Sequence, residues 1–170
     1  MLATSIPAIH MLVGLGFMIL VVAAAIEDAQ RLVIPNRYCM SIAILYPAYV
    51  LTAPESLEWW IAVLVAGGLF VAGFLVYLRG WVGGGDAKLI SSIALWAGGD
   101  LILEFLILTG IAGGAMAITL WLRHRLQRAP SLGMIPFTES APDFRKRPMP
   151  YGLAIGAGGL YVAFTVLGLL

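Results

Sequence analysis

The sequence predicts an all-α membrane protein, a six-transmembrane-helix bundle with both termini outside and no soluble domain. Hydrophobic residues make up 61% of the 170 residues and charged residues only 11%, whereas a soluble domain carries about 25% charged residues. The chain also contains several uncharged runs close to the roughly 20 residues that cross a bilayer as a helix. Residues 1–170 are therefore expected to form a single transmembrane domain.

Six apolar segments can be read along the chain. Uncharged runs at 7–26, 38–54, 59–78 and 151–170 predict four helices, and the run at 101–122, apolar apart from Glu104, predicts a fifth. A shorter run at 87–98 predicts a sixth, about 18 Å long at 1.5 Å per residue. Glycines in the third and sixth segments are expected to form close-packing surfaces; they are Gly67, Gly68, Gly73, Gly156, Gly158 and Gly159.

The positions of the basic residues predict how the bundle is oriented in the membrane. If loops alternate sides, all 10 basic residues fall in the loops at 27–37, 79–88 and 123–150, which the positive-inside rule assigns to the cytoplasm. The basic loop 123–150 is expected to touch anionic lipid and anchor the topology. Ala23-Ala24-Ala25 looks like a signal-peptide cleavage site, but residues 1–10 hold no Lys or Arg, which argues against cleavage.

The chain lacks the residues that several classes of function require. The only cysteine, Cys39, supports neither a disulfide framework nor a cysteine zinc cage, and the two histidines form no HExxH pattern. A net charge of +1 gives no reason to expect nucleic-acid binding. No metal and no organic cofactor is expected.

One carboxylate lies at an unusual place, in the run Gly83-Gly84-Gly85-Asp86. The simple interpretation is a loop with Asp86 as a helix N-cap. However, the following helix is short, so if Trp96 lies near the outer interface, Asp86 lies within the thickness of the membrane. A carboxylate there is costly and is a functional candidate, and irregular glycine backbone at that depth is tolerated where it is buried or lines a water-filled cavity.

A partner for Asp86 follows the first apolar run. Asp28 closes that run on the same inner face, Pro35 fixes the loop that follows, and Asn36 is expected to cap the second helix. Two carboxylates close enough to share a proton are the working unit of an aspartic peptidase. The sequence therefore favours a carboxylate pair at the inner end of the bundle.

Three motifs give the chain a resemblance to a known family. They are Asp28 followed by Ile34-Pro35-Asn36, then 83–89 (GGGDAKL), then 150–155 (PYGLAI). In this order and spacing they resemble the type IV prepilin peptidases, GxGD-type intramembrane aspartic proteases. The resemblance implies that Asp28 and Asp86 are catalytic. It also implies that the other motif residues bind substrate or shape the site, namely Pro35, Asn36, Gly83, Gly84, Gly85, Lys88, Tyr151 and Gly152.

The resemblance also implies substrates and a location. The substrates would be prepilins or pseudopilins, cut between a basic leader and a hydrophobic segment at the cytoplasmic face of a bacterial inner membrane, with both enzyme termini periplasmic. Membrane lipids and the pilus-assembly machinery are further expected partners, and loop 123–150 is a candidate docking segment. Larger members carry a Cys-x-x-Cys insert and N-methylate the product. This chain has one cysteine and resembles the short tight-adherence (Flp) form, so methyltransferase activity is not expected.

Alternatives remain open at this stage. Lys88 with Ser91 and Ser92 is conceivable as a Ser–Lys peptidase, although a snorkelling lysine beside two packing serines is the simpler interpretation. A small transporter or proton relay could use Asp28 and Asp86, and a non-catalytic pilus-assembly protein could dispense with both. Within a dyad, helix dipoles would make Asp86 the base and Asp28 the acid.

Overall fold

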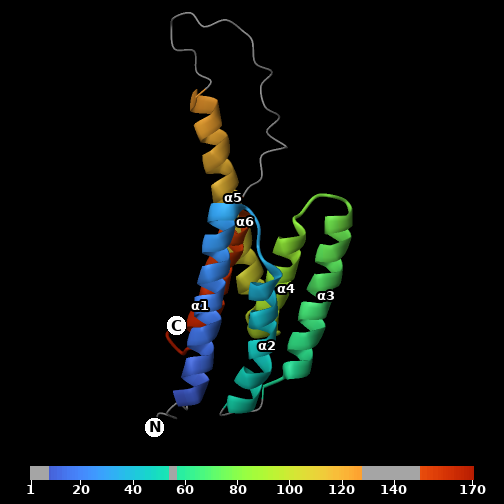
Figure 1. The fold of residues 1–170 in the computed structure, drawn as a ribbon, viewed down its shortest axis with the longest axis vertical. Coiled ribbons are helices and arrows are strands. Elements are labelled where there is room, and N and C mark those ends of the chain that lie inside the picture. The colour runs from blue at the N-terminus through green and yellow to red at the C-terminus, as the bar shows by residue number, and fades with distance from the viewer. Residues whose placement is uncertain (1–7, 54–56, 128–149) are drawn as a thin grey trace, which may run out of the picture.

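The computed structural model describes residues 8–53, 57–127 and 150–170, which form six α-helices and no strand (Figure 1). The helices are α1 (Ala8–Arg31), α2 (Asn36–Thr52), α3 (Trp59–Leu78), α4 (Gly84–Ala97), α5 (Ile102–Gln127) and α6 (Tyr151–Val166). The predicted all-α fold is confirmed. Three segments are long and apolar enough to cross a membrane, namely α1, α3 and Ile102–Arg123 of α5. Six spans with both termini outside remain a prediction, and most of loop 123–150 lies outside the described residues.

Two helix starts differ from the sequence-based expectation. α4 begins at Gly84 with Gly83 in the N-cap position, so Asp86 lies inside the first turn and the N-cap interpretation of this residue is wrong. α2 begins at Asn36 with Pro35 in the N-cap position and without a capping side-chain hydrogen bond. The expectation that Asn36 caps α2 is therefore also wrong, and its side chain is available for another contact.

α4 lies at the centre of the bundle. It packs against α2, α3, α5 and α6, while α1 packs against α2 and α6 (Figure 1). The last turns of α1, α3 and α5 and the first turns of α2, α4 and α6 point toward one end of the bundle. The connections at 32–35 and 79–83, which carry two of the motifs, thus meet at the same end.

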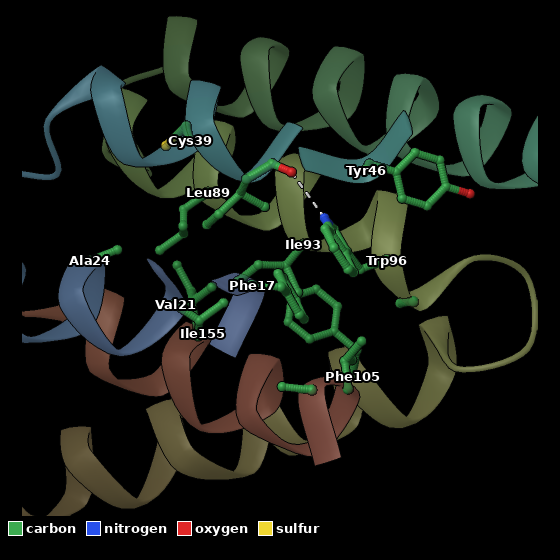
Figure 2. Close-up of a cluster of buried hydrophobic side chains, with 14 of the residues drawn as sticks. Phe17, Val21, Ala24, Cys39, Tyr46, Leu89, Ile93, Trp96, Phe105 and Ile155 are labelled. Atoms are coloured by element: carbon green, nitrogen blue, oxygen red, sulfur yellow. Dashed lines mark hydrogen bonds between the residues drawn. The ribbon is translucent and has the colours of Figure 1, made fainter. Parts of the chain in front are cut away.

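An aromatic stack fixes α4 to two neighbours (Figure 2). The rings of Phe17 and Trp96 are stacked with their centroids 4.1 Å apart, and Trp96 Nε1–H donates a hydrogen bond to the carbonyl of Ile42 at 3.0 Å. Trp96 is only 4% exposed. It is a core residue that joins α1, α2 and α4, and its place near the outer membrane interface stays a prediction.

The glycines of α3 and α6 behave differently. A Cβ built at Gly73 would lie 2.9 Å from the Cβ of Ala87, and one at Gly156 would lie 2.7 Å from the Cβ of Ala25. The absence of side chains there lets α3 approach α4 and α6 approach α1, and Gly158 and Gly159 are similarly close to their neighbours. At Gly67 and Gly68, by contrast, no described atom lies within 4 Å of the built Cβ. The close-packing prediction is confirmed for the other four glycines and is wrong for this pair.

Candidate active site

Asp28, in the last turn of α1, lies against the start of α6. It is 5% exposed, and the backbone N–H of Gly152, in the first turn of α6, donates a hydrogen bond to its Oδ2 at 2.6 Å. A Cβ built at Gly152 would lie 2.7 Å from both the Cβ and the Oδ2 of Asp28. Only glycine at position 152 gives α6 this close approach, which explains why the motif around 150–155 has a glycine there.

Asp86 is positioned by the first turn of α4 and by the three glycines before it. A Cβ built at Gly83 would lie 2.8 Å from Asp86 Oδ2, one at Gly84 would lie 3.2 Å from the Tyr77 ring, and one at Gly85 would lie 3.1 Å from Ile34 Cβ. Each glycine therefore leaves space for a different neighbour. Gly85 in particular lets the α1–α2 connection approach the start of α4.

The two carboxylates share one cleft at the motif end of the bundle. The cleft has a volume of about 710 Å³, and both Asp28 and Asp86 line it. The other lining residues come from the α1–α2 connection, the α3–α4 connection with the start of α4, and the start of α6; they are Leu32, Val33, Ile34, Trp81, Val82, Gly83, Gly84, Gly85 and Tyr151. Both predicted acids thus line the same cleft, and their action as a catalytic pair stays a prediction.

The remaining predicted site residues lie beside the cleft. Lys88 Nζ donates a hydrogen bond to Asn36 Oδ1 at 3.0 Å, which ties the first turn of α4 to the first residue of α2. Pro35, the residue before α2, and this polar pair are absent from the lining of the cleft in the described part of the chain. The Lys88–Asn36 bond joins two elements that border the cleft, and Gly152 contacts Asp28 directly.

Apolar residues of the two connections form part of the cleft that the motifs do not specify. Trp81 is 77% exposed and Val33 is 61% exposed, and both line the cleft with Leu32. Leu32 has a positive φ of 55°, an uncommon conformation for leucine that turns the chain directly after α1. The only signal in the sequence was their nearness to the two candidate acids, since Leu32 and Val33 follow Asp28 and Trp81 precedes Asp86.

The α1–α2 connection is braced by one acidic residue. Glu27 Oε1 lies 3.3 Å from Arg31 Nε and 3.5 Å from Arg37 Nη2, and the Tyr38 hydroxyl donates to Glu27 Oε2 at 3.4 Å. Each of these partly exposed pairs contributes little alone, about 0–1 kcal/mol. Together they join the end of α1 to the start of α2 across the connection that carries Ile34.

Two helix ends act on Asp28, whereas one acts on Asp86. Asp86 lies in the first turn of α4, as expected. The Asp28 carboxylate, although carried by the last part of α1, receives its hydrogen bond from the first turn of α6. Asp28 therefore lies near the C-terminal end of α1 and the N-terminal end of α6, whose dipoles act on its charge in opposite directions. The assignment of Asp86 as the base and Asp28 as the acid stays a prediction.

A Ser–Lys arrangement is also disfavoured by the hydrogen bonds. Ser91 Oγ donates to the Ala87 carbonyl at 2.7 Å and Ser92 Oγ to the Lys88 carbonyl at 2.8 Å. Both hydroxyls thus bond to the helix backbone four residues earlier, while Lys88 Nζ bonds to Asn36. Within the described ranges, no group of three or more His, Cys, Asp or Glu side chains is placed to hold a metal ion.

Comparison with known proteins gives two matches. The model of the type IV leader peptidase family matches residues 15–118, which include both aspartates. A curated relative, the prepilin leader peptidase/N-methyltransferase of Bacillus subtilis (strain 168), is 30% identical over 150 residues, which cover 85% of this chain and 52% of the relative. The chain thus spans about half the length of the curated relative it matches. No solved structure matches it.

Proposed function

Because the chain belongs to the type IV leader peptidase family, we propose that it is an intramembrane aspartic endopeptidase that removes the basic leader from prepilins and prepilin-like proteins. The observation that carries the proposal is the cleft lined by Asp28 and Asp86. These carboxylates come from two helices, and the glycines around them exclude side chains that would block or displace them. Such a site suits a peptide substrate whose backbone must come close to the two carboxylates.

The proposed chemistry is hydrolysis by water held between the two carboxylates. One carboxylate accepts a proton from the water as its oxygen attacks the scissile carbonyl carbon, and the protonated partner gives its proton to the carbonyl oxygen. The resulting gem-diol collapses as the C–N bond breaks and the leaving nitrogen takes up a proton. The products are a leader with a new carboxyl terminus and a mature protein with a new amino terminus. No metal or organic cofactor takes part in this scheme.

We place the cleft at the cytoplasmic face of the bacterial inner membrane. The ends of α1, α3 and α5 and the starts of α2 and α4 point toward the motif end of the bundle (Figure 1), and the described cations belong to these parts of the chain; they are Arg31, Arg37, Arg79, Lys88, Arg123 and Arg125. The positive-inside rule assigns this end to the cytoplasm. In this orientation the leader is cut where it leaves the membrane. A fusion of alkaline phosphatase to the C-terminus is expected to be active, since the sixth helix then ends in the periplasm.

The test is cleavage of a prepilin by the purified protein in liposomes, read by mass spectrometry. Asp28→Asn and Asp86→Asn are each expected to lower the rate at least about a thousandfold, because the loss of one residue from a group that acts together removes most of the catalysis. Asp100→Asn is the matched control, since this exposed aspartate lies on the α4–α5 turn away from the cleft. Thermal unfolding of every variant separates lost chemistry from lost folding.

The outcomes separate the candidate functions. Loss of cleavage in both cleft variants, with Asp100→Asn active, supports the dyad. If the wild type cuts none of its host's prepilins, the peptidase proposal fails, and proton flux measured in the same liposomes then tests the relay alternative. If both cleft variants still cut, the carboxylates are not the catalytic pair. Assignment to the Flp pilus type depends on which host prepilins are cut.

A further inference from the structure

A second cavity lies on the flank of the bundle, between α2 and α3. Both helices pack on α4 without packing extensively on each other, which leaves a groove of about 500 Å³ between them with α4 as its floor. We call this the lateral groove. It differs from the cleft, because none of the residues that line the groove also lines the cleft.

The lining residues show that the groove runs along the helix axes. Each helix contributes one stripe with spacing i, i+3, i+4, i+7, the pattern of a single helix face over two turns. The stripes are Asn36, Cys39, Met40 and Ala43 on α2; Val63, Ala66, Gly67 and Phe70 on α3; and Lys88, Ser91, Ser92 and Leu95 on α4. Three parallel stripes of two turns extend about 10 Å at 1.5 Å per residue. A groove of this shape fits the face of another helix.

The chemistry of the groove suits an apolar occupant inside a membrane. Two of the four floor residues, Ser91 and Ser92, are small, and both of their hydroxyls are bonded to helix carbonyls, so they demand no partner from an occupant. Its walls carry exposed apolar side chains, Met40 at 60% and Phe70 at 45% exposure. Small residues on the floor let a helix backbone approach closely, which is how helices associate in lipid.

The position of the groove identifies which helix it takes. Its inner end is the Lys88–Asn36 hydrogen bond. Lys88 lies two residues after Asp86, and Asn36 two residues after Ile34, which lines the cleft. A chain that leaves the cleft across this bond therefore enters the groove directly. Neither a lipid acyl chain nor a second copy of the protein needs to reach the carboxylates, so neither accounts for a groove that ends beside the cleft.

On the basis of the proposed function, we propose that the lateral groove binds the hydrophobic helix of the substrate, on the mature side of the scissile bond. The helix enters sideways from the lipid between α2 and α3, and its first residues unwind over Lys88 and Asn36 into the cleft. The groove then determines which membrane substrates are cut, while the cleft performs the cut.

The two exposed glycines of α3 give a matched test. A Cβ at Gly67 or at Gly68 meets no described atom within 4 Å, so both positions have open space where a leucine side chain would begin. Only Gly67 lines the groove. Gly67→Leu projects a side chain into the groove, whereas Gly68→Leu adds the same side chain to the same helix about 100° away around its axis.

Two synthetic substrates separate groove binding from catalysis. The first carries a basic leader, the scissile bond and a twenty-residue apolar helix in liposomes, and the second ends a few residues after the scissile bond. Gly67→Leu is expected to lower kcat/KM at least tenfold on the first substrate, mainly through KM, and less than twofold on the second. Gly68→Leu is expected to change neither by more than twofold.

Photo-crosslinking gives an independent measurement in an Asp86→Asn background, which keeps the substrate uncut. A benzophenone side chain at Met40, on the groove wall, is expected to capture the substrate helix, whereas one at Ile111, 63% exposed on α5, which contributes no residue to the groove, is not. Capture of lipid or of a second copy at position 40 overturns the proposal. So does equal cleavage by the two leucine variants, or an equal loss on both substrates. If the wild type cuts neither substrate, the proposed function fails, and this inference fails with it.

Discussion

Substitution of Gly152 by alanine tests how Asp28 is positioned. The new Cβ would lie 2.7 Å from the Cβ and Oδ2 of Asp28, so the atoms must separate by roughly 0.7 Å to reach the 3.4 Å of an ordinary contact. Overpacking of this kind costs about 1–3 kcal/mol. The same movement lengthens the 2.6 Å hydrogen bond to Asp28, a class of bond that contributes about 1.5–3 kcal/mol when one partner is charged.

The expected effect on catalysis follows from that displacement. A misplacement of about 1 Å in a catalytic constellation costs about a hundredfold in rate, which corresponds to about 2.7 kcal/mol in the barrier. Gly152→Ala is therefore expected to lower kcat by about a hundredfold. Prepilin cleavage in liposomes measures the rate, and thermal unfolding in detergent measures the loss of stability.

Gly156 provides the matched control one turn further along α6. A Cβ there would lie 2.7 Å from the Cβ of Ala25, so Gly156→Ala disturbs the same α1–α6 interface without touching the carboxylate. The two variants are expected to lose similar stability, with the large loss of kcat confined to Gly152→Ala. Equal loss of activity in both would show that general packing is responsible, and full activity in a folded Gly152→Ala would refute the positioning role of this contact.

Four further predictions concern the core and the chemistry. Trp96→Phe keeps the stack on Phe17 but removes the hydrogen bond to the Ile42 carbonyl, and it is expected to lower the unfolding free energy by about 1 kcal/mol; an unchanged unfolding curve would contradict this. Gly73→Leu forces α3 away from Ala87 and is expected to cost about 1–3 kcal/mol, measured by the same unfolding assay against Gly68→Leu, which has no such clash. The cleavage rate is expected to have a bell-shaped pH dependence, because a shared proton is lost at high pH and a second one blocks the base at low pH; a rate that stays flat across the acidic range would argue against a carboxylate pair. Mass spectrometry with S-adenosylmethionine present is expected to find the mature product unmethylated, and a mass increase of one methyl group would overturn that expectation.

The sequence could predict the fold class and the pair of acids because both depend on local patterns. Apolar runs mark helices by their length, and a carboxylate at the end of such a run stands out against them. The approach of Gly152 to Asp28 could not be derived this way, since it joins residues 124 positions apart in sequence. The packing of Trp96 could not be predicted for a related reason: tryptophan at the end of an apolar segment suits an interface as well as a core, and only the arrangement of α1 and α2 shows that its ring is buried.

The glycines also show which features the sequence predicts and which depend on contacts between helices. Gly67 and Gly73 are both glycines of one apolar helix, yet a Cβ at Gly73 meets Ala87 at 2.9 Å and a Cβ at Gly67 meets nothing within 4 Å. A glycine in an apolar helix therefore indicates close packing only where another element lies against it. For Gly83, Gly84 and Gly85 each neighbour is found within the protein itself. For Gly67, on the groove beside the candidate site, the proposed neighbour is the helix of the substrate.

The candidate site also extends beyond the part of the chain that the family model matches. That match ends at residue 118 and contains both aspartates, but the hydrogen bond that holds Asp28 comes from Gly152 on α6. Residues 15–118 alone would therefore carry the two acids without the contact that orients one of them, and without the Tyr151 side of the cleft. The carboxylate that α1 supplies becomes a positioned group only when α6 packs against it, so α6 belongs to the active unit as much as α1 and α4 do.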